Sequence, residues 1–224
     1  MRIRRRVMTL AGCLLALAPV SGVPAARAQT EATDYKVLPV PQPTESPGKI
    51  EVIEFFSYGC PHCAEFFPLL SSWLGSLPKD VVLRRVPVGF NRPAWVNLQR
   101  AYFALQASGD LAKLDGALFH AIHQEQLPLF EEQALEEWVG KSGGHADKFA
   151  SAYASFGVNS LTVQADKMTE DYQVTSIPTM VVNGKYVAQG NTFSELIAST
   201  DKLIAKARAE RAPAAAPKNA APRK

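Results

Sequence analysis

The residues of this 224-residue chain whose types and spacing suggest a chemical function are Cys60 and Cys63, which are separated by Pro61 and His62. A disulfide across so short a loop removes little entropy from the unfolded chain and would add little stability. A zinc site needs about four ligands, and the chain has few histidines to complete one. Those outside the pair are His120, His123 and His145. Thiol–disulfide exchange is therefore the favoured interpretation, ahead of a structural disulfide and a zinc site.

The sequence on either side of the pair predicts a strand that runs directly into a helix. Residues 50–56 are mostly apolar, β-branched or aromatic, which indicates a buried strand. Residues 61–75 carry apolar side chains at helical spacing. Cys60 would then lie at or near the helix N-cap, where unpaired N–H groups and the helix dipole favour an anion such as a thiolate. Pro61 fits the first helical turn, and a protonated His62 would add positive charge beside Cys60.

The rest of the chain predicts a mixed sheet interrupted by a run of helices. A short strand over 35–38 comes first, and a second central strand over 81–88 completes a β-α-β unit with parallel strands. Helices are predicted over 94–108, 111–124, 131–139, 146–156 and 160–171, the third and fourth stopping at Gly140 and Gly157. Asn183-Gly184 between two β-rich runs is a strong hairpin signal. A helix over 193–209 would close the fold.

Two segments together resemble the DsbA-type thiol:disulfide oxidoreductases of the bacterial periplasm. The first is Glu54-Phe55-Phe56-Ser57-Tyr58-Gly59-Cys60-Pro61-His62-Cys63, and the second is Ile177-Pro178-Thr179. The resemblance covers about residues 35–208 and implies an α/β architecture, a thioredoxin fold with an inserted all-helical domain. It implies thioredoxin-like parts over 29–92 and 160–209, with the helical insertion over 93–159.

In this family resemblance, Cys60 is the expected nucleophile and Cys63 its buried partner. A substrate thiolate would attack Cys60 of the oxidised pair to form a mixed disulfide, and a second substrate thiol would release the product. A stabilised Cys60 thiolate would make the disulfide a stronger oxidant; a low thiol pKa and an oxidising potential are known for DsbA itself and are carried over from it. His62 would tune Cys60 through its charge or a hydrogen bond to the sulfur. The alternative is a passive surface histidine.

The resemblance also implies roles for Glu54 and for the Ile177–Pro178 bond. Glu54 would lie buried beneath the cysteines and assist proton transfer at Cys63; the alternative is that strand alternation turns it to solvent. Some family members carry a lysine near this glutamate on the next strand, where this chain offers Leu83-Arg84-Arg85 and no lysine. The Ile177–Pro178 bond is expected to be cis and to face the cysteines, with Ile177 backbone groups pairing with an extended substrate.

The N-terminal sequence predicts a cleaved secretory signal over residues 1–28. A basic start is followed by an apolar stretch over 7–20 and by the cleavage site Ala26-Arg27-Ala28. Leu10-Ala11-Gly12-Cys13 also resembles a lipoprotein signal, which leaves lipidation of Cys13 as an alternative. Cleavage would remove five of the 24 basic residues and leave 19 against 21 acidic ones, a formal charge of −2, so nothing indicates a nucleic-acid partner. The Ala/Pro/Lys-rich tail over 210–224 is expected to be disordered.

The combined expectation is a monomeric periplasmic enzyme that donates the Cys60–Cys63 disulfide to newly exported proteins. A membrane oxidase of the DsbB type, linked to quinone, would re-oxidise it, and no cofactor or metal is expected beyond the cysteine pair. A reductase or isomerase of the same fold, an oxidase dedicated to one client, and a non-catalytic chaperone-like domain stay open. His120 and His123 are interpreted as surface residues of a helix, and His145 as a loop residue. The aromatic residues interpreted as core are Phe66, Phe67, Trp73, Trp95 and Trp138.

Overall fold

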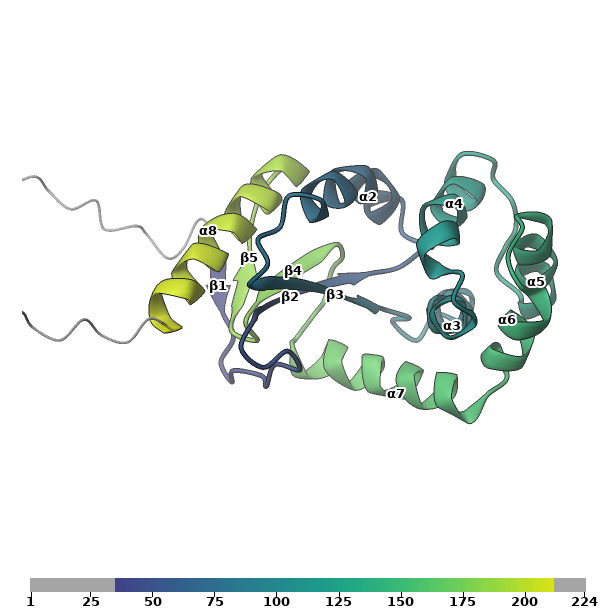
Figure 1. Cartoon of the computed structure of the whole chain (residues 1–224), viewed down its shortest axis with the longest axis horizontal. Helices are drawn as coiled ribbons and strands as arrows, with labels where there is room; N and C mark the ends of the chain where they lie inside the picture. Colours follow the sequence, from purple (N-terminus) through teal and green to yellow (C-terminus); the bar gives the residue numbers. More distant parts are fainter. Residues whose placement is uncertain (1–34, 212–224) are drawn as a thin grey trace, which may run out of the picture.

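The computed structural model describes residues 35–211, in which a five-stranded mixed sheet is surrounded by helices (Figure 1). The strands are β1 (Tyr35–Val37), β2 (Ile50–Phe56), β3 (Val81–Pro87), β4 (Thr179–Val182) and β5 (Tyr186–Ala188). Their order in the sheet is β1-β5-β4-β2-β3, with β2 and β3 parallel and the other pairs antiparallel. The expected signal peptide, Cys13 and the tail beyond 211 lie outside the described residues.

The helices fall into two groups by position. They are α2 (Pro61–Leu74), α3 (Pro93–Ser108), α4 (Leu111–His123), α5 (Glu132–Lys141), α6 (Ala146–Tyr153), α7 (Phe156–Asp171) and α8 (Phe193–Arg211). In Figure 1, α2 and α8 lie over one face of the sheet and α7 lies beneath the other, while α3 to α6 gather beyond the β3 edge. This is the predicted thioredoxin arrangement with a helical insertion between β3 and β4. No helix between residues 35 and 211 is long and apolar enough to span a bilayer.

Strand β2 leads directly to the cysteine pair, and its position is fixed because both of its faces are buried. All seven of its residues are buried. Ile50 and Val52 pack with Phe66 of α2 in one apolar cluster, while Phe56 belongs to a second cluster that continues into the insertion, including Leu118 of α4. Full burial of side chains of this size contributes about 1.5–3 kcal/mol each. The insertion and the sheet therefore share one core, which fixes the position of α3 and α4 relative to the end of β2.

The Asn-Gly hairpin was predicted from sequence and is confirmed. Asn183 and Gly184 both have positive φ, 55° and 64°, as the two central residues of a type I′ turn require. A Cβ at Gly184 would lie 2.1 Å from the carbonyl oxygen of Gln42, so the close approach of that loop also requires glycine. The hairpin pairs β4 with β5 and places the start of β4, with Pro178 just before it, beside the end of β2.

Four predicted helix boundaries differ from the structure: the end of α6, the start of α7, and the ends of α5 and α8. The hydroxyl of Ser155 accepts a hydrogen bond from the Val158 N–H and caps α7, so the helix begins at Phe156 and Gly157 lies inside its first turn rather than stopping α6. Helix α5 continues through Gly140 to Lys141, because the left-handed turn falls later, at Gly143. Helix α8 runs to Arg211, so residues 210 and 211 are helical. The expected domain boundary between residues 159 and 160 falls within α7.

Candidate active site

Cys60 is the N-cap residue of α2 and Cys63 lies one turn further in. Cys60 has extended backbone dihedrals (φ −93°, ψ 117°), and Pro61 occupies the first helical turn with its ring exposed. Both cysteines are free thiols in this structure. The side chain of Cys60 is 6% exposed and that of Cys63 is fully buried, so only the first is within reach of a second molecule.

The two thiols differ in pKa because their surroundings differ. The Cys63 thiol donates a hydrogen bond to the Cys60 sulfur, which is the largest of the effects that lower the pKa of Cys60 to about 6. The backbone N–H groups of Cys63 and His62 and the charge of His62 act in the same direction, and burial opposes them. Burial and the neighbouring Cys60 raise the pKa of Cys63. Near neutral pH Cys60 is therefore the thiolate and Cys63 keeps its proton.

His62 lies at the surface beside Cys60. Its side chain is 72% exposed, with Nδ1 3.5 Å from a carboxylate oxygen of Glu65, and its ring centroid lies 6.5 Å from that of Phe193. Through its charge, His62 lowers the pKa of Cys60. Electrostatic tuning of Cys60 is one of the two ways in which His62 was predicted to act, and it stays a prediction.

The Ile177–Pro178 segment faces the cysteine from the other end of the chain. The peptide bond is cis, as predicted, and the carbonyl oxygen of Ile177 lies 3.8 Å from the Cys60 sulfur. Both residues are half-buried, so one side of the segment is open. The fold thus brings together two segments that are 117 positions apart in the sequence.

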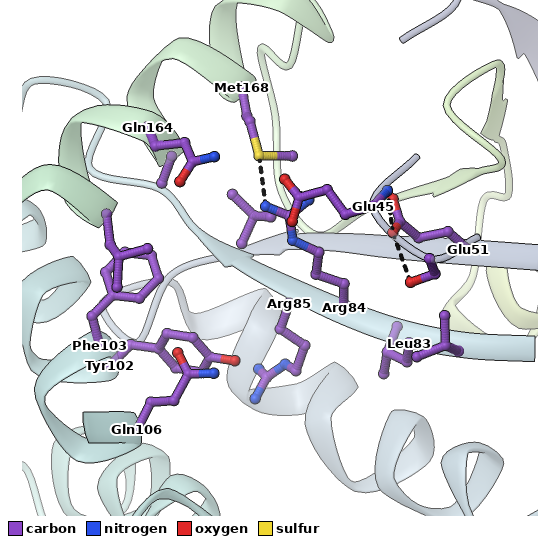
Figure 2. A pocket seen from close by; sticks show the side chains of 15 residues that line it. Glu45, Glu51, Leu83, Arg84, Arg85, Tyr102, Phe103, Gln106, Gln164 and Met168 are labelled. Atoms are coloured by element: carbon purple, nitrogen blue, oxygen red, sulfur yellow. Dashed lines mark hydrogen bonds and ion pairs between the residues drawn. The ribbon is translucent and has the colours of Figure 1, made fainter. Parts of the chain in front are cut away.

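Glu54 is fully buried, so the alternative in which it points to solvent is wrong. Its partner is Arg85, which lies opposite it in the parallel register of β2 and β3 and donates from Nε to a Glu54 carboxylate oxygen. Burial raises the pKa of Glu54 above its usual value, and the charge and hydrogen bond of Arg85 offset only part of that rise. Arg84 leaves β3 in the opposite direction and pairs with Glu45 at 2.9 Å, as Figure 2 shows. Arg85 is therefore the cation that could not be placed from sequence.

The Glu54–Arg85 pair extends to the active-site loop and to the insertion. Arg85 also donates to a carboxylate oxygen of Asp115 on α4 at 2.5 Å. Asp115 in turn accepts a hydrogen bond of 2.6 Å from the hydroxyl of Tyr58, two residues before Cys60. The guanidinium packs over the ring of Phe56, 3.8 Å from its centroid. Sequence reasoning found Glu54 alone and missed the other members of this network.

Two further residues of the insertion touch the loop before Cys60, and neither was predicted to do so. His123 was interpreted as a surface residue, but its Nε2 donates to the carbonyl oxygen of Tyr58 at 2.7 Å. Trp95 was interpreted as core, but it packs against Gly59, where a Cβ would come within 2.6 Å of the indole nitrogen. The sequence placed His120 and His123 on one face of a helix, but this spacing does not identify Tyr58 as the residue that His123 contacts.

Replacing His123 with alanine should lower the free energy of unfolding by about 1 kcal/mol, because the hydrogen bond to the Tyr58 carbonyl is lost. His120→Ala is the matched control: His120 lies on the same helix, is exposed, and pairs with exposed Glu125. It should cost about 0.5 kcal/mol or less. Denaturant unfolding of both reduced variants measures the difference, and equal losses would argue against the contact.

Among residues 35–211, no group of three or more His, Cys, Asp or Glu side chains is placed to hold an ion. His145 has a structural role instead: it is the N-cap residue of α6, and its Nδ1 lies 2.8 Å from Asp110. A polar groove of about 470 Å³ lies between β3, α3 and α7 (Figure 2), lined by residues such as Arg84, Gln106 and Met168. Neither cysteine lines this groove, but Arg85, the partner of Glu54, does.

Comparison with known proteins gives a consistent answer. Residues 51–200 match the model of the DSBA-like thioredoxin domain. The thiol:disulfide interchange protein DsbA of Bordetella parapertussis is 38% identical over 189 residues, covering 83% of this chain and 89% of the relative. DsbA of Pseudomonas aeruginosa is 37% identical over 200 residues, covering 88% and 94%.

Solved structures agree with the sequence comparison. The crystal structure of Pseudomonas aeruginosa DsbA superimposes with a TM-score of 0.76 at 37% identity, covering 80% of this chain and 94% of that one. DsbA from Xylella fastidiosa gives 0.74 at 32% identity, covering 79% and 96%.

Proposed function

This chain belongs to the DsbA-like family of thiol:disulfide oxidoreductases, and on that premise we propose that it works as an oxidase, donating the Cys60–Cys63 disulfide to reduced proteins. The observation that carries the proposal is the unequal acidity of the two thiols at the start of α2. Lowering the pKa of Cys60 to about 6 stabilises the reduced state, in which Cys60 is a thiolate. A stabilised reduced state makes the disulfide more oxidising.

The reaction starts from the oxidised pair. A substrate thiolate attacks the Cys60 sulfur, the bond to Cys63 breaks, and Cys63 leaves as a thiolate that takes up a proton, with Glu54 as the buried group that assists. A second substrate thiolate then attacks the substrate sulfur of the mixed disulfide, and Cys60 leaves. Its low pKa makes it a good leaving group in this step. The substrate loses two electrons and two protons; the enzyme disulfide takes up both electrons, Cys63 binds one of the protons, and near neutral pH Cys60 remains a thiolate while the other proton passes to solvent.

The open side of the Ile177–Pro178 segment would bind the substrate. Backbone groups of Ile177 could pair with an extended chain next to Cys60, and main-chain pairing tolerates many sequences. Pro178 supplies no N–H toward the cysteines. Pro61 and His62, the residues next to Cys60 in the chain, are both exposed.

The compartment and partners follow from the same proposal. Residues 1–28 would direct export to the periplasm and be removed, and newly exported proteins with free thiols would be the substrates. A DsbB-type quinone-linked oxidase would restore the Cys60–Cys63 disulfide. The protein would act as a monomer with no cofactor beyond that disulfide.

The proposal is tested by mixing one equivalent of the oxidised protein with a reduced peptide that contains two cysteines. Mass spectrometry should show the peptide losing two hydrogens while Cys60 and Cys63 become free thiols. A protein that leaves the reduced peptide unchanged but reduces or reshuffles a disulfide-bonded one would be a reductase or an isomerase.

The stability of the reduced protein should depend on pH through Cys60. The pKa is about 6 in the folded protein and about 8.5 in an unfolded chain, so folding stabilises the thiolate. This contribution should be fully present above about pH 8.5 and lost as the pH falls through about 6. Denaturant unfolding of the reduced protein between these pH values measures it. Cys60→Ser should lack this part of the pH dependence, and an unchanged profile in that variant would contradict the assignment.

A further inference from the structure

Asp115 competes with Glu54 for a single cation. Both carboxylates accept hydrogen bonds from the guanidinium of Arg85, which is itself 10% exposed. Glu54 comes from β2 and Asp115 from α4 of the insertion. Two carboxylates and one guanidinium leave a formal charge of −1 when all are ionised, so Arg85 cannot neutralise both.

The excess negative charge destabilises the ionised form of Glu54 more than that of Asp115. The side chain of Asp115 is 18% exposed, whereas Glu54 is fully buried. Water can stabilise the first carboxylate in its ionised form, and a fully buried one has no such help. A proton bound anywhere in the cluster is therefore expected at Glu54. Burial raises the pKa of Glu54, and the charge of Asp115 adds to that effect.

Glu54 has a carboxylate oxygen available for this proton. One oxygen accepts from Arg85, while the other, Oε1, is buried and has no hydrogen-bond partner among the residues from 35 to 211. The charge of Glu54 raises the pKa of the Cys63 thiol, so the two groups are close enough to interact electrostatically. Cys63 is the group that must gain a proton when the disulfide opens.

We propose that Asp115 is a positioning residue for the reaction at Cys63: by sharing Arg85, it keeps the buried Glu54 able to hold the proton that Cys63 takes up. This rests on the proposed role of Glu54 and assigns the helical insertion a part in the chemistry of the thioredoxin-like domain. The titratable or charged groups around Glu54 are Tyr58 after β2, Cys63 on α2, Arg85 on β3, Tyr102 on α3 and Asp115 on α4.

Tyr58 fixes the orientation of Asp115. Its hydroxyl donates to one oxygen of Asp115, and Arg85 donates to the other, so the carboxylate has both oxygens engaged. Burial raises the pKa of Tyr58 well above its usual value, so the hydroxyl keeps its proton and remains a donor. The link from Asp115 thus reaches the loop that carries Cys60.

The test compares wild type with Asp115→Asn, which removes the charge and keeps the size. With Arg85 left to Glu54 alone, the pKa of Glu54 should fall. The rate at which a reduced peptide opens the Cys60–Cys63 disulfide is measured by stopped flow across the pH range. The ratio of wild-type to variant rates should be about one at low pH and rise to about tenfold above the Glu54 pKa. Dividing one rate by the other cancels the ionisation of the peptide thiol.

One double variant and one single-substitution control separate this role from a structural one. In a Glu54→Gln background, Asp115→Asn should have no pH-dependent effect, because the proton carrier is gone. Glu125→Gln, an exposed carboxylate just after the end of the helix that carries Asp115, makes the same change in net charge and should leave the ratio at one. A rate loss that is constant across pH, or that persists in the Glu54→Gln background, would overturn the proposal.

A second variant covers poor folding of Asp115→Asn. Tyr58→Phe keeps every charge but frees Asp115, and should produce a smaller ratio change with the same pH dependence. The absence of any pH-dependent change in both variants would overturn the inference. If wild type itself gave no disulfide to the peptide, the proposed oxidase function would fail, which is a distinct result.

Discussion

The Cys63→Ser protein is expected to stop at the mixed disulfide, with oxidase turnover reduced to background. Cys60 keeps its place at the N-cap of α2, but no second thiol remains to displace a bound partner from its sulfur. After incubation with the disulfide-linked dimer of a single-cysteine peptide, so that the attached half carries no second thiol, non-reducing mass spectrometry should show one peptide attached to each protein molecule. The adduct should persist until a reductant is added.

Cys60→Ser is the matched control. The remaining thiol, Cys63, is fully buried and its pKa is raised, so it should form no adduct in the folded protein. A stable adduct at Cys63 in this control, or rapid loss of the adduct in Cys63→Ser, would reverse the assigned roles of the two cysteines.

Arg85→Met is expected to lower the free energy of unfolding by about 3–5 kcal/mol, the typical cost of removing one partner of a buried ion pair. In this variant the buried Glu54 loses its cationic partner, and Asp115 loses its ion pair with Arg85. Methionine replaces much of the volume, so the loss reports the charge rather than a cavity. Denaturant unfolding with an unchanged m-value provides the measurement.

Arg84→Met supplies the comparison on the neighbouring residue of the same strand. Arg84 pairs with the largely exposed Glu45, and such pairs contribute about 1 kcal/mol or less. Adding Glu54→Gln to Arg85→Met should restore part of the lost stability, because the unpaired buried charge is removed. Similar losses for Arg84→Met and Arg85→Met would contradict the buried network.

What could be predicted from sequence was local along the chain. The Cys60-Pro61-His62-Cys63 segment at a strand-to-helix junction and the Asn183-Gly184 turn each follow from the preferences of a few consecutive residues, and the structure places both as expected. The cis Ile177–Pro178 bond was expected only because of the family resemblance. Its position beside Cys60 depends on the pairing of β2 with β4.

What could not be predicted depended on contacts across the sheet and between domains. Whether Arg84 or Arg85 faces Glu54 is decided by the register of β2 against β3, and a shift of one residue would exchange the two faces. The contacts of Asp115 and His123 with Tyr58 join positions 57 and 65 residues apart. No local pattern marks such partners, because they meet only once the insertion has packed against the sheet.

The reduction potential of the Cys60–Cys63 pair, measured in glutathione redox buffers, tests the oxidase function most directly. A pair whose reduced form is stabilised by the Cys60 thiolate should equilibrate at a potential well above that of glutathione, and the potential should fall toward it in a variant with a higher Cys60 pKa, such as His62→Ala. A potential well below that of glutathione would contradict the account and identify the protein as a reductant.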